Sequence, residues 1–98
     1  MTQKTLVSIV TESDIEKMVI EEILRLGPDS YTTTEVRGRG PRRGDHWDPK
    51  EYRAVRIEVL CDSAVGQAIV DKLSAHYFRG YSMMITLSPI TVLRSHPS

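Results

Sequence analysis

The 98-residue sequence contains one cysteine, one tryptophan and one phenylalanine, and it has no excess of charge of either sign. A single cysteine excludes an internal disulfide and any multi-cysteine metal site, and Cys61 lies in an apolar run where a buried, unreactive thiol is expected. Thirteen basic and thirteen acidic residues give a net charge of zero, which argues against nucleic-acid binding and direct membrane binding. The sequence has no apolar run of membrane-spanning length and no secretory signal pattern, so a soluble, cytoplasmic protein is expected.

The length predicts one domain covering residues 1–98, with a modest core that oligomerisation would help to stabilise. Hydrophobic periodicity and turn residues divide this domain into strands and helices. Strands are expected near residues 5–11, 31–37, 52–61 and 81–87, with a short fifth near 90–93, and helices are expected near residues 15–26 and 62–79. The polar tail, residues 94–98, is expected to fray.

The helix boundaries are predicted from capping residues. Ser13 and Glu16 have the spacing of a capping box, and Asp62 or Ser63 is expected to cap the second helix. Gly27 and Gly80 are expected to end the two helices in a left-handed conformation.

The predicted order is strand, helix, strand, long loop, strand, helix, strand. This is the α+β, ferredoxin-like βαββαβ pattern, a four-stranded antiparallel sheet with both helices on one face. The first strand is apolar on both sides, which indicates that the other face of the sheet is also covered. A second copy of the chain would cover it most simply.

The loop between the second and third strands, residues 38–51, is longer than an ordinary hairpin loop. Four arginines crowd into seven residues at its start, namely Arg37, Arg39, Arg42 and Arg43. Gly38 and Gly40 permit close approach of a ligand to the backbone, and guanidinium groups suit bidentate contact with phosphate oxygens. The pattern suits phosphate binding, and a solvated loop is an equally open interpretation. The acidic residues that follow closely argue against a disordered RNA-binding segment.

A family resemblance covers most of the chain. It lies in LVSIVTE at residues 6–12, GPDSYTTTEVRGRGPRRG at residues 27–44 and AHYFRGYSMMITLSPITVL at residues 75–93. These blocks resemble PII-like signalling proteins of the SbtB and carboxysome-associated (CPII) kind. The resemblance implies a non-enzymatic ferredoxin-like homotrimer that binds adenine nucleotides in clefts between subunits. A flexible T-loop, residues 38–51 here, would report nucleotide occupancy to a partner in inorganic-carbon regulation, a bicarbonate transporter or a carboxysome-linked protein, so that any membrane contact is indirect.

The resemblance also implies residue roles. The phosphates would contact Gly38, Arg39, Gly40, Arg42 and Arg43. The adenine or ribose would lie beside Thr33, Glu35 and Val36, and the cleft would be closed by Arg79, Gly80, Tyr81, Leu87 and Ser88. Bicarbonate would bind near Arg39 and Arg42. His46 and Trp47 would contact the protein partner, although Trp47 could instead fold back onto its own trimer.

The chain departs from the nitrogen-sensing PII proteins in one informative place. Their motif T-G-x-x-G-D-G-K has no counterpart between Phe78 and Met83. The absent lysine favours AMP or ADP as the ligand, with cyclic AMP or ATP as alternatives.

Two other classes share the fold. An acylphosphatase needs an arginine in a glycine loop directly after the first strand, where this chain has Thr11, Glu12 and Ser13. A CutA-like trimeric metal-binding protein is the second alternative, but Cys61 and three scattered histidines do not form a recognisable metal site. The sequence contains no convincing catalytic constellation, so no catalytic residues, metal ligands or catalytic cofactor are predicted.

Overall fold

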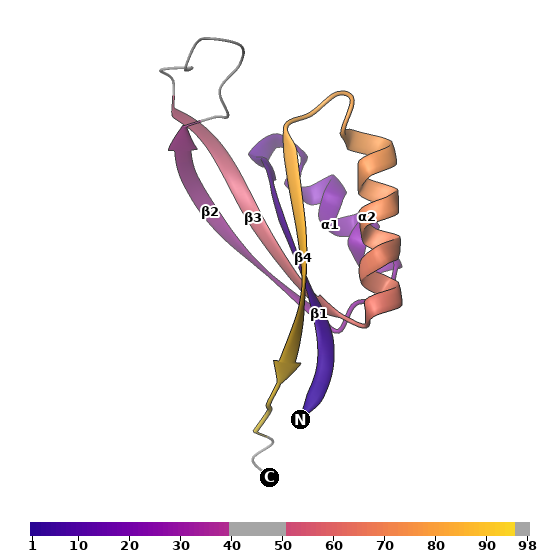
Figure 1. Cartoon of the computed structure of the whole chain (residues 1–98). Helices are drawn as coiled ribbons and strands as arrows, with labels where there is room; N and C mark the ends of the chain where they lie inside the picture. Colours follow the sequence, from indigo (N-terminus) through magenta and orange to yellow (C-terminus); the bar gives the residue numbers. More distant parts are fainter. Residues whose placement is uncertain (40–50, 96–98) are drawn as a thin grey trace.

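The structure is a computed structural model, and it describes residues 1–39 and 51–95. Its elements, in chain order, are β1 (Thr2–Glu12), the 3-10 turn η1 (Ser13–Ile15), α1 (Glu16–Arg25), β2 (Ser30–Arg39), β3 (Glu51–Cys61), α2 (Ser63–Tyr77) and β4 (Met83–Val92). The four strands form one antiparallel sheet in the order β2-β3-β1-β4. Both helices lie on the same face of this sheet (Figure 1). The predicted ferredoxin-like fold is therefore confirmed.

The core lies between the sheet and the helices because alternate strand residues point to the same face. Buried residues of β1 and β3, such as Val7 and Ile57, pack with Ile23 of α1 and with Ile69 and Leu73 of α2. The intervening strand residues point away from the helices, and we call this side of the sheet the open face. Neither helix in the described part of the chain is both long and apolar enough to cross a membrane.

Two capping predictions were wrong. The capping box at Ser13 and Glu16 does not form, because Ser13 begins the η1 turn and Ile15 precedes α1 without a side-chain capping hydrogen bond. Gly27 has a φ of 80° after α1, as predicted. The prediction that Gly80 has a left-handed conformation was wrong. Helix α2 ends at Tyr77, whose carbonyl accepts the N–H groups of both Gly80 and Tyr81.

Three strand boundaries also differ. β4 runs without a break through Pro89, so the separate fifth strand was wrong; Pro89 is tolerated because β4 is an edge strand of the sheet. β2 and β3 continue to Arg39 and Glu51, and Gly38 pairs with Tyr52 inside the ladder. The connection is therefore shorter at both ends than predicted. Residues 40–50 of the predicted T-loop and residues 96–98 of the predicted frayed tail lie outside the described residues.

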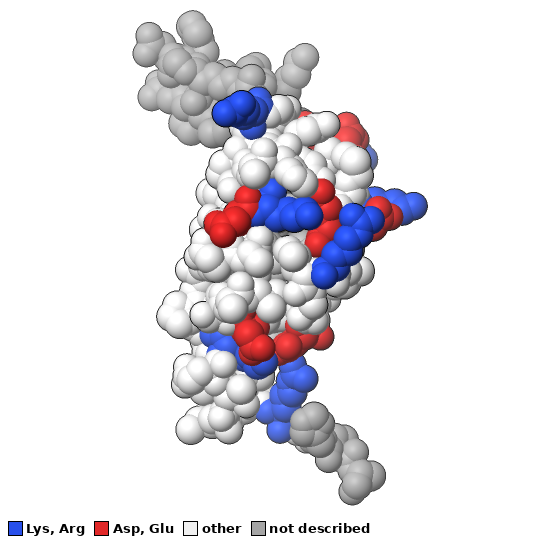
Figure 2. Space-filling model, turned by 90° about the vertical axis from the view of Figure 1, so that its right-hand side faces the viewer, with Lys and Arg blue, Asp and Glu red and all other residues white. Residues whose placement is uncertain are grey.

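Charged side chains are mixed by sign on the helix-covered side of the molecule. In Figure 2, which shows this side, blue and red groups lie next to one another within a largely uncharged surface. For the described residues in this view, the distribution agrees with the zero net charge and offers no broad basic surface for nucleic acid.

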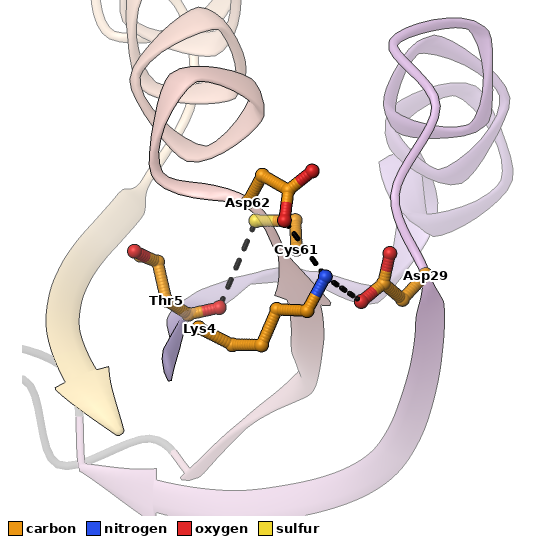
Figure 3. Close-up of polar contacts among 5 residues, drawn as sticks. All are labelled: Lys4, Thr5, Asp29, Cys61 and Asp62. Carbon is orange, nitrogen blue, oxygen red and sulfur yellow. Dashed lines mark hydrogen bonds and ion pairs between the residues drawn. The ribbon is translucent and has the colours of Figure 1, made fainter. Parts of the chain in front are cut away.

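A lysine at the start of β1 connects three elements (Figure 3). Lys4 Nζ lies 2.8 Å from Oδ2 of Asp29, just before β2, and 2.7 Å from Oδ1 of Asp62, just before α2. The contact with Asp29, followed by that with Asp62, raises the pKa of Lys4. Asp62 occupies the predicted N-cap position of α2, but its carboxylate makes no capping hydrogen bond. Beside it, the buried Cys61 thiol donates to the carbonyl of Thr5 at 3.7 Å, and burial raises its pKa, as expected of an unreactive thiol.

Candidate functional site

One end of the sheet gathers several of the predicted site residues. Here β1 and β2 finish while β3 and β4 begin, with Thr11 paired to both Val55 and Met83. We call this the loop end, because the predicted T-loop leaves β2 and enters β3 here (Figure 1). The turn from α2 to β4, residues 78–82, lies at the same end. The fold therefore brings the end of β2, where the predicted phosphate-binding segment begins, and the predicted closing turn to one end of the sheet.

The predicted β2 residues lie on two different faces. Thr33 and Glu35 pair with Ile57 and Val55, so they share the face that the helices cover, whereas the neighbouring Val36 belongs to the open face. Thr33 and Glu35 are nevertheless exposed, since β2 is an edge strand and extends beyond the helices. A planar ligand on one side of β2 would contact either Thr33 and Glu35 or Val36, but not all three side chains.

The turn at residues 78–82 is anchored to both helices. Tyr77 is buried, and its ring meets that of Tyr81 edge to face, with the centroids 5.7 Å apart. Burial, followed by the nearby Glu22 carboxylate, raises the pKa of Tyr77 to about 12. The adjacent His76 brings Nδ1 to 2.9 Å from Oε1 of Glu22, which joins the end of α2 to α1. These contacts hold the turn in place and leave its side chains exposed.

Leu87 and Ser88 lie far from this turn within one chain. They pair with Val7 and Leu6 in the middle of the sheet, and only Ser88 belongs to the open face. Ser88 lies five positions after Met83, a distance of roughly 16 Å along a strand. A single chain therefore does not bring Leu87 and Ser88 together with residues 79–81 around one ligand.

A hollow on the open face lies near Ser88, and the sequence did not reveal it. It has a volume of about 400 Å³ and is lined by residues of all four strands, including Leu6, Thr32, Glu58, Leu60 and Ile90. Leu60 is six residues from Ala54 at the loop end, which corresponds to roughly 20 Å. The open-face hollow combines apolar side chains with a hydroxyl and a carboxylate. No local motif marks it, because its residues come from four separate strands.

Five predicted residues, Gly40, Arg42, Arg43, His46 and Trp47, lie outside the described part of the chain. Gly38 and Arg39 are the last residues of β2, so the described backbone carries them to the loop end. Within residues 1–39 and 51–95, no three histidine, cysteine, aspartate or glutamate side chains are grouped to hold a metal ion.

The sheet and its two helices form a ferredoxin-like domain, a fold that PII proteins share with other classes. A family model for nitrogen regulatory protein P-II matches residues 4–97, and the chain belongs to that family. A PII-like signalling protein of Thermus thermophilus is 33% identical, with a TM-score of 0.78 over 94% of this chain and 91% of that one. These findings confirm the resemblance seen in the sequence.

More distant structures share the fold. CPII of Thiomonas intermedia K12, solved with ADP, AMP and bicarbonate, is 16% identical, with a TM-score of 0.78 over 97% of this chain and 98% of that one. GlnK of B. subtilis, solved with ATP, is 21% identical, with a TM-score of 0.67 over 91% and 84% of the two chains. No curated protein matches the chain by sequence.

Proposed function

We propose that this chain is a non-enzymatic signalling protein that forms a homotrimer and binds AMP or ADP in clefts between its subunits. Cyclic AMP and ATP are the alternative ligands. Occupancy of the cleft is relayed through the T-loop to a protein partner in inorganic-carbon regulation, either a bicarbonate transporter or a carboxysome-linked protein. Membership of the P-II family and the position of Arg37 and Arg39 at the end of β2 support this function.

The observation that carries the proposal is the separation of the candidate binding groups along the sheet. The end of β2 at Arg39 and residues 79–81 lie at the loop end, while Ser88 and the open-face hollow lie roughly 16 to 20 Å away along the strands. One small ligand cannot contact both groups of a single chain. A cleft between copies can, because the loop end of one subunit then faces the hollow of the next.

The open face supplies a second argument for association. Leu6, Val10 and Leu60 give it an apolar centre, and Met84 at its edge is 60% exposed in the single chain. An apolar surface of this kind on a small domain favours contact with other copies. The three-fold assembly follows from the family resemblance.

The chemistry of the two groups is complementary to a nucleotide. The apolar side chains of the open-face hollow suit a base, and the Glu58 carboxylate can accept a hydrogen bond from an exocyclic amine. The arginines at the start of the T-loop suit the phosphate end, with Arg39 and Arg42 also able to hold bicarbonate. The ligands of CPII, which are ADP, AMP and bicarbonate, support this assignment. His46 and Trp47 are proposed to meet the protein partner.

Calorimetric titration tests the ligand. Wild-type protein is titrated with AMP, ADP, cyclic AMP and ATP, each with and without bicarbonate, and its mass is measured by light scattering. We expect the double variant Arg39→Ala, Arg42→Ala to lose more than about a hundredfold in affinity, because two charge-assisted contacts to phosphate are removed, while the trimer remains.

The matched control removes the same charge elsewhere. Lys17→Ala, Arg25→Ala changes two exposed cations of α1, outside the proposed cleft, and should bind nucleotide as the wild type does. Failure of the wild type to bind any adenine nucleotide would refute the function. ATP binding much tighter than that of AMP and ADP would refute only the ligand preference.

A further inference from the structure

The backbone of Ser82 is held by two side chains from the end of β1. The hydroxyl of Thr11 donates to the carbonyl oxygen of Ser82 at 2.8 Å, and the N–H of Ser82 donates to Oε2 of Glu12 at 2.7 Å. Both main-chain polar groups of one residue are thus paired with consecutive side chains of a distant strand. We call these two hydrogen bonds the Ser82 clamp.

The clamp occurs where the regular ladder between β1 and β4 stops. The last residue pair is Thr11 with Met83, and one further step in the same register would pair Glu12 with Ser82. The side chains of Thr11 and Glu12 therefore take over where the backbone pairing ends. At the other end of the turn, the Tyr77 carbonyl accepts N–H groups at 3.1 and 3.0 Å. Residues 79–81 are consequently fixed at both ends.

We propose that Thr11 and Glu12 are positioning residues for the nucleotide site and act through the Ser82 clamp on residues 79–81. This inference rests on the proposed function, in which that turn closes the cleft. Residues 79–81 are all exposed, so burial does not order them. A turn that is ordered before the ligand arrives loses less conformational entropy on binding. The affinity of the site for the nucleotide is correspondingly higher.

Because Glu12 is charged, the direction of the change in nucleotide affinity on its removal tests the proposal. Glu12 is an acid at the same end of the sheet as the proposed phosphate contacts. If it acted only by its charge, its removal would strengthen the binding of an anionic nucleotide. Positioning through Ser82 requires the opposite result, weaker binding when the hydrogen bond is removed.

The test uses paired variants of the full chain. Thr11→Val and Glu12→Ala each remove one hydrogen bond, whereas Thr11→Ser and Glu12→Gln keep a hydroxyl and an acceptor oxygen at the same places. Glu12→Gln and Glu12→Ala lose the same charge, so they separate charge from positioning. Ser82→Ala is the control, because both clamp bonds use the backbone of Ser82.

Two measurements are made on each variant. Amide exchange of Ser82 in nucleotide-free protein, followed by NMR, reports the clamp itself, and calorimetry with AMP and ADP reports the site. We expect about tenfold faster exchange in Glu12→Ala, a smaller increase in Thr11→Val, and affinities roughly three- to tenfold weaker in both. Thr11→Ser, Glu12→Gln and Ser82→Ala should remain close to the wild type in both measurements.

The outcomes separate this inference from the function on which it rests. Faster Ser82 exchange with unchanged affinity would overturn the positioning role and leave the nucleotide site standing. Equal effects of Glu12→Ala and Glu12→Gln, or unchanged exchange in Glu12→Ala and Thr11→Val, would overturn it as well. A wild-type protein that binds neither AMP nor ADP would refute the proposed function, and the positioning role would fall with it.

Discussion

Lys4 Nζ lies 2.7 Å from Oδ1 of Asp62, although Asp62 occupies the position from which a carboxylate commonly caps a helix. The Asp62 carboxylate thus links β1 to α2 and does not accept a hydrogen bond from the first turn of its own helix. Asp29 holds the same ammonium group at 2.8 Å, so one lysine joins the starts of β1, β2 and α2. These ion pairs lie at the end of the sheet opposite the loop end.

Replacing Lys4 by Met should lower the melting temperature, because Asp29 and Asp62 then face each other without the cation. Thermal unfolding at neutral pH measures the effect. Lys17→Met is the matched control, since Lys17 is exposed on α1 and the substitution removes the same charge. Equal melting temperatures for the two variants would show that the contacts of Lys4 contribute nothing beyond its charge.

Gly66 allows α2 to approach β1 closely. A Cβ atom at Gly66 would lie 3.1 Å from Cγ2 of Thr5 and 3.4 Å from Cγ2 of Val7. Gly66→Ala should therefore lose about 1 kcal/mol of unfolding free energy. The overpacking cost, about 2 kcal/mol, exceeds the gain in helix propensity of about 1 kcal/mol. Chemical denaturation measures this change.

The Gly66 interpretation can be checked with a second substitution. Thr5→Ser removes the Cγ2 methyl group that a Cβ at residue 66 would meet, while the hydroxyl stays. In that background Gly66→Ala should become neutral or stabilising, since only the propensity gain of about 1 kcal/mol remains. The same loss in both backgrounds would exclude the contact with Thr5 as its cause.

The buried Tyr77 should make stability fall at alkaline pH. Its pKa is raised from 10 to about 12, so between these values the unfolded chain loses a proton that the folded protein retains. The unfolding free energy then decreases as pH rises through this window, by at most about 3 kcal/mol. Denaturation at pH 9 to 12 should show a shallower decrease in Tyr77→Phe than in the wild type. Tyr31→Phe, at a residue that is 40% exposed, should keep the wild-type slope.

The fold could be predicted because its main signals are local. Alternation at Val55, Ile57 and Val59 assigns one face of β3 to the core, and the structure confirms it. At the start of α2, the N-cap residue was predicted correctly but its hydrogen bond was not, because a distant partner holds its carboxylate. Asp62 binds Lys4, which is 58 residues away, and no pattern around residue 62 indicates that contact.

The candidate site likewise has one part that the local sequence predicts and another that depends on distant residues. Arginine and glycine at the start of the T-loop are recognisable as a segment suited to phosphate. The Ser82 clamp joins residues about 70 positions apart, and the open-face hollow takes side chains from four strands. Both depend on strand register, which hydrophobic pattern alone does not specify in detail.

The exposed Met84 provides a test of association through the open face. Met84 is 60% exposed in the single chain, so Met84→Arg should cost an isolated subunit little. If three copies pack their open faces together, the substitution places a charge in that apolar interface and should convert the trimer to smaller species, because an unpaired buried charge is strongly unfavourable. Met18→Arg, at a residue of α1 that is 48% exposed, introduces the same charge on the other side of the molecule and should leave the trimer intact. Light scattering gives the mass of each variant. A Met84→Arg protein with the wild-type trimer mass would mean that the open face around Met84 does not lie between subunits.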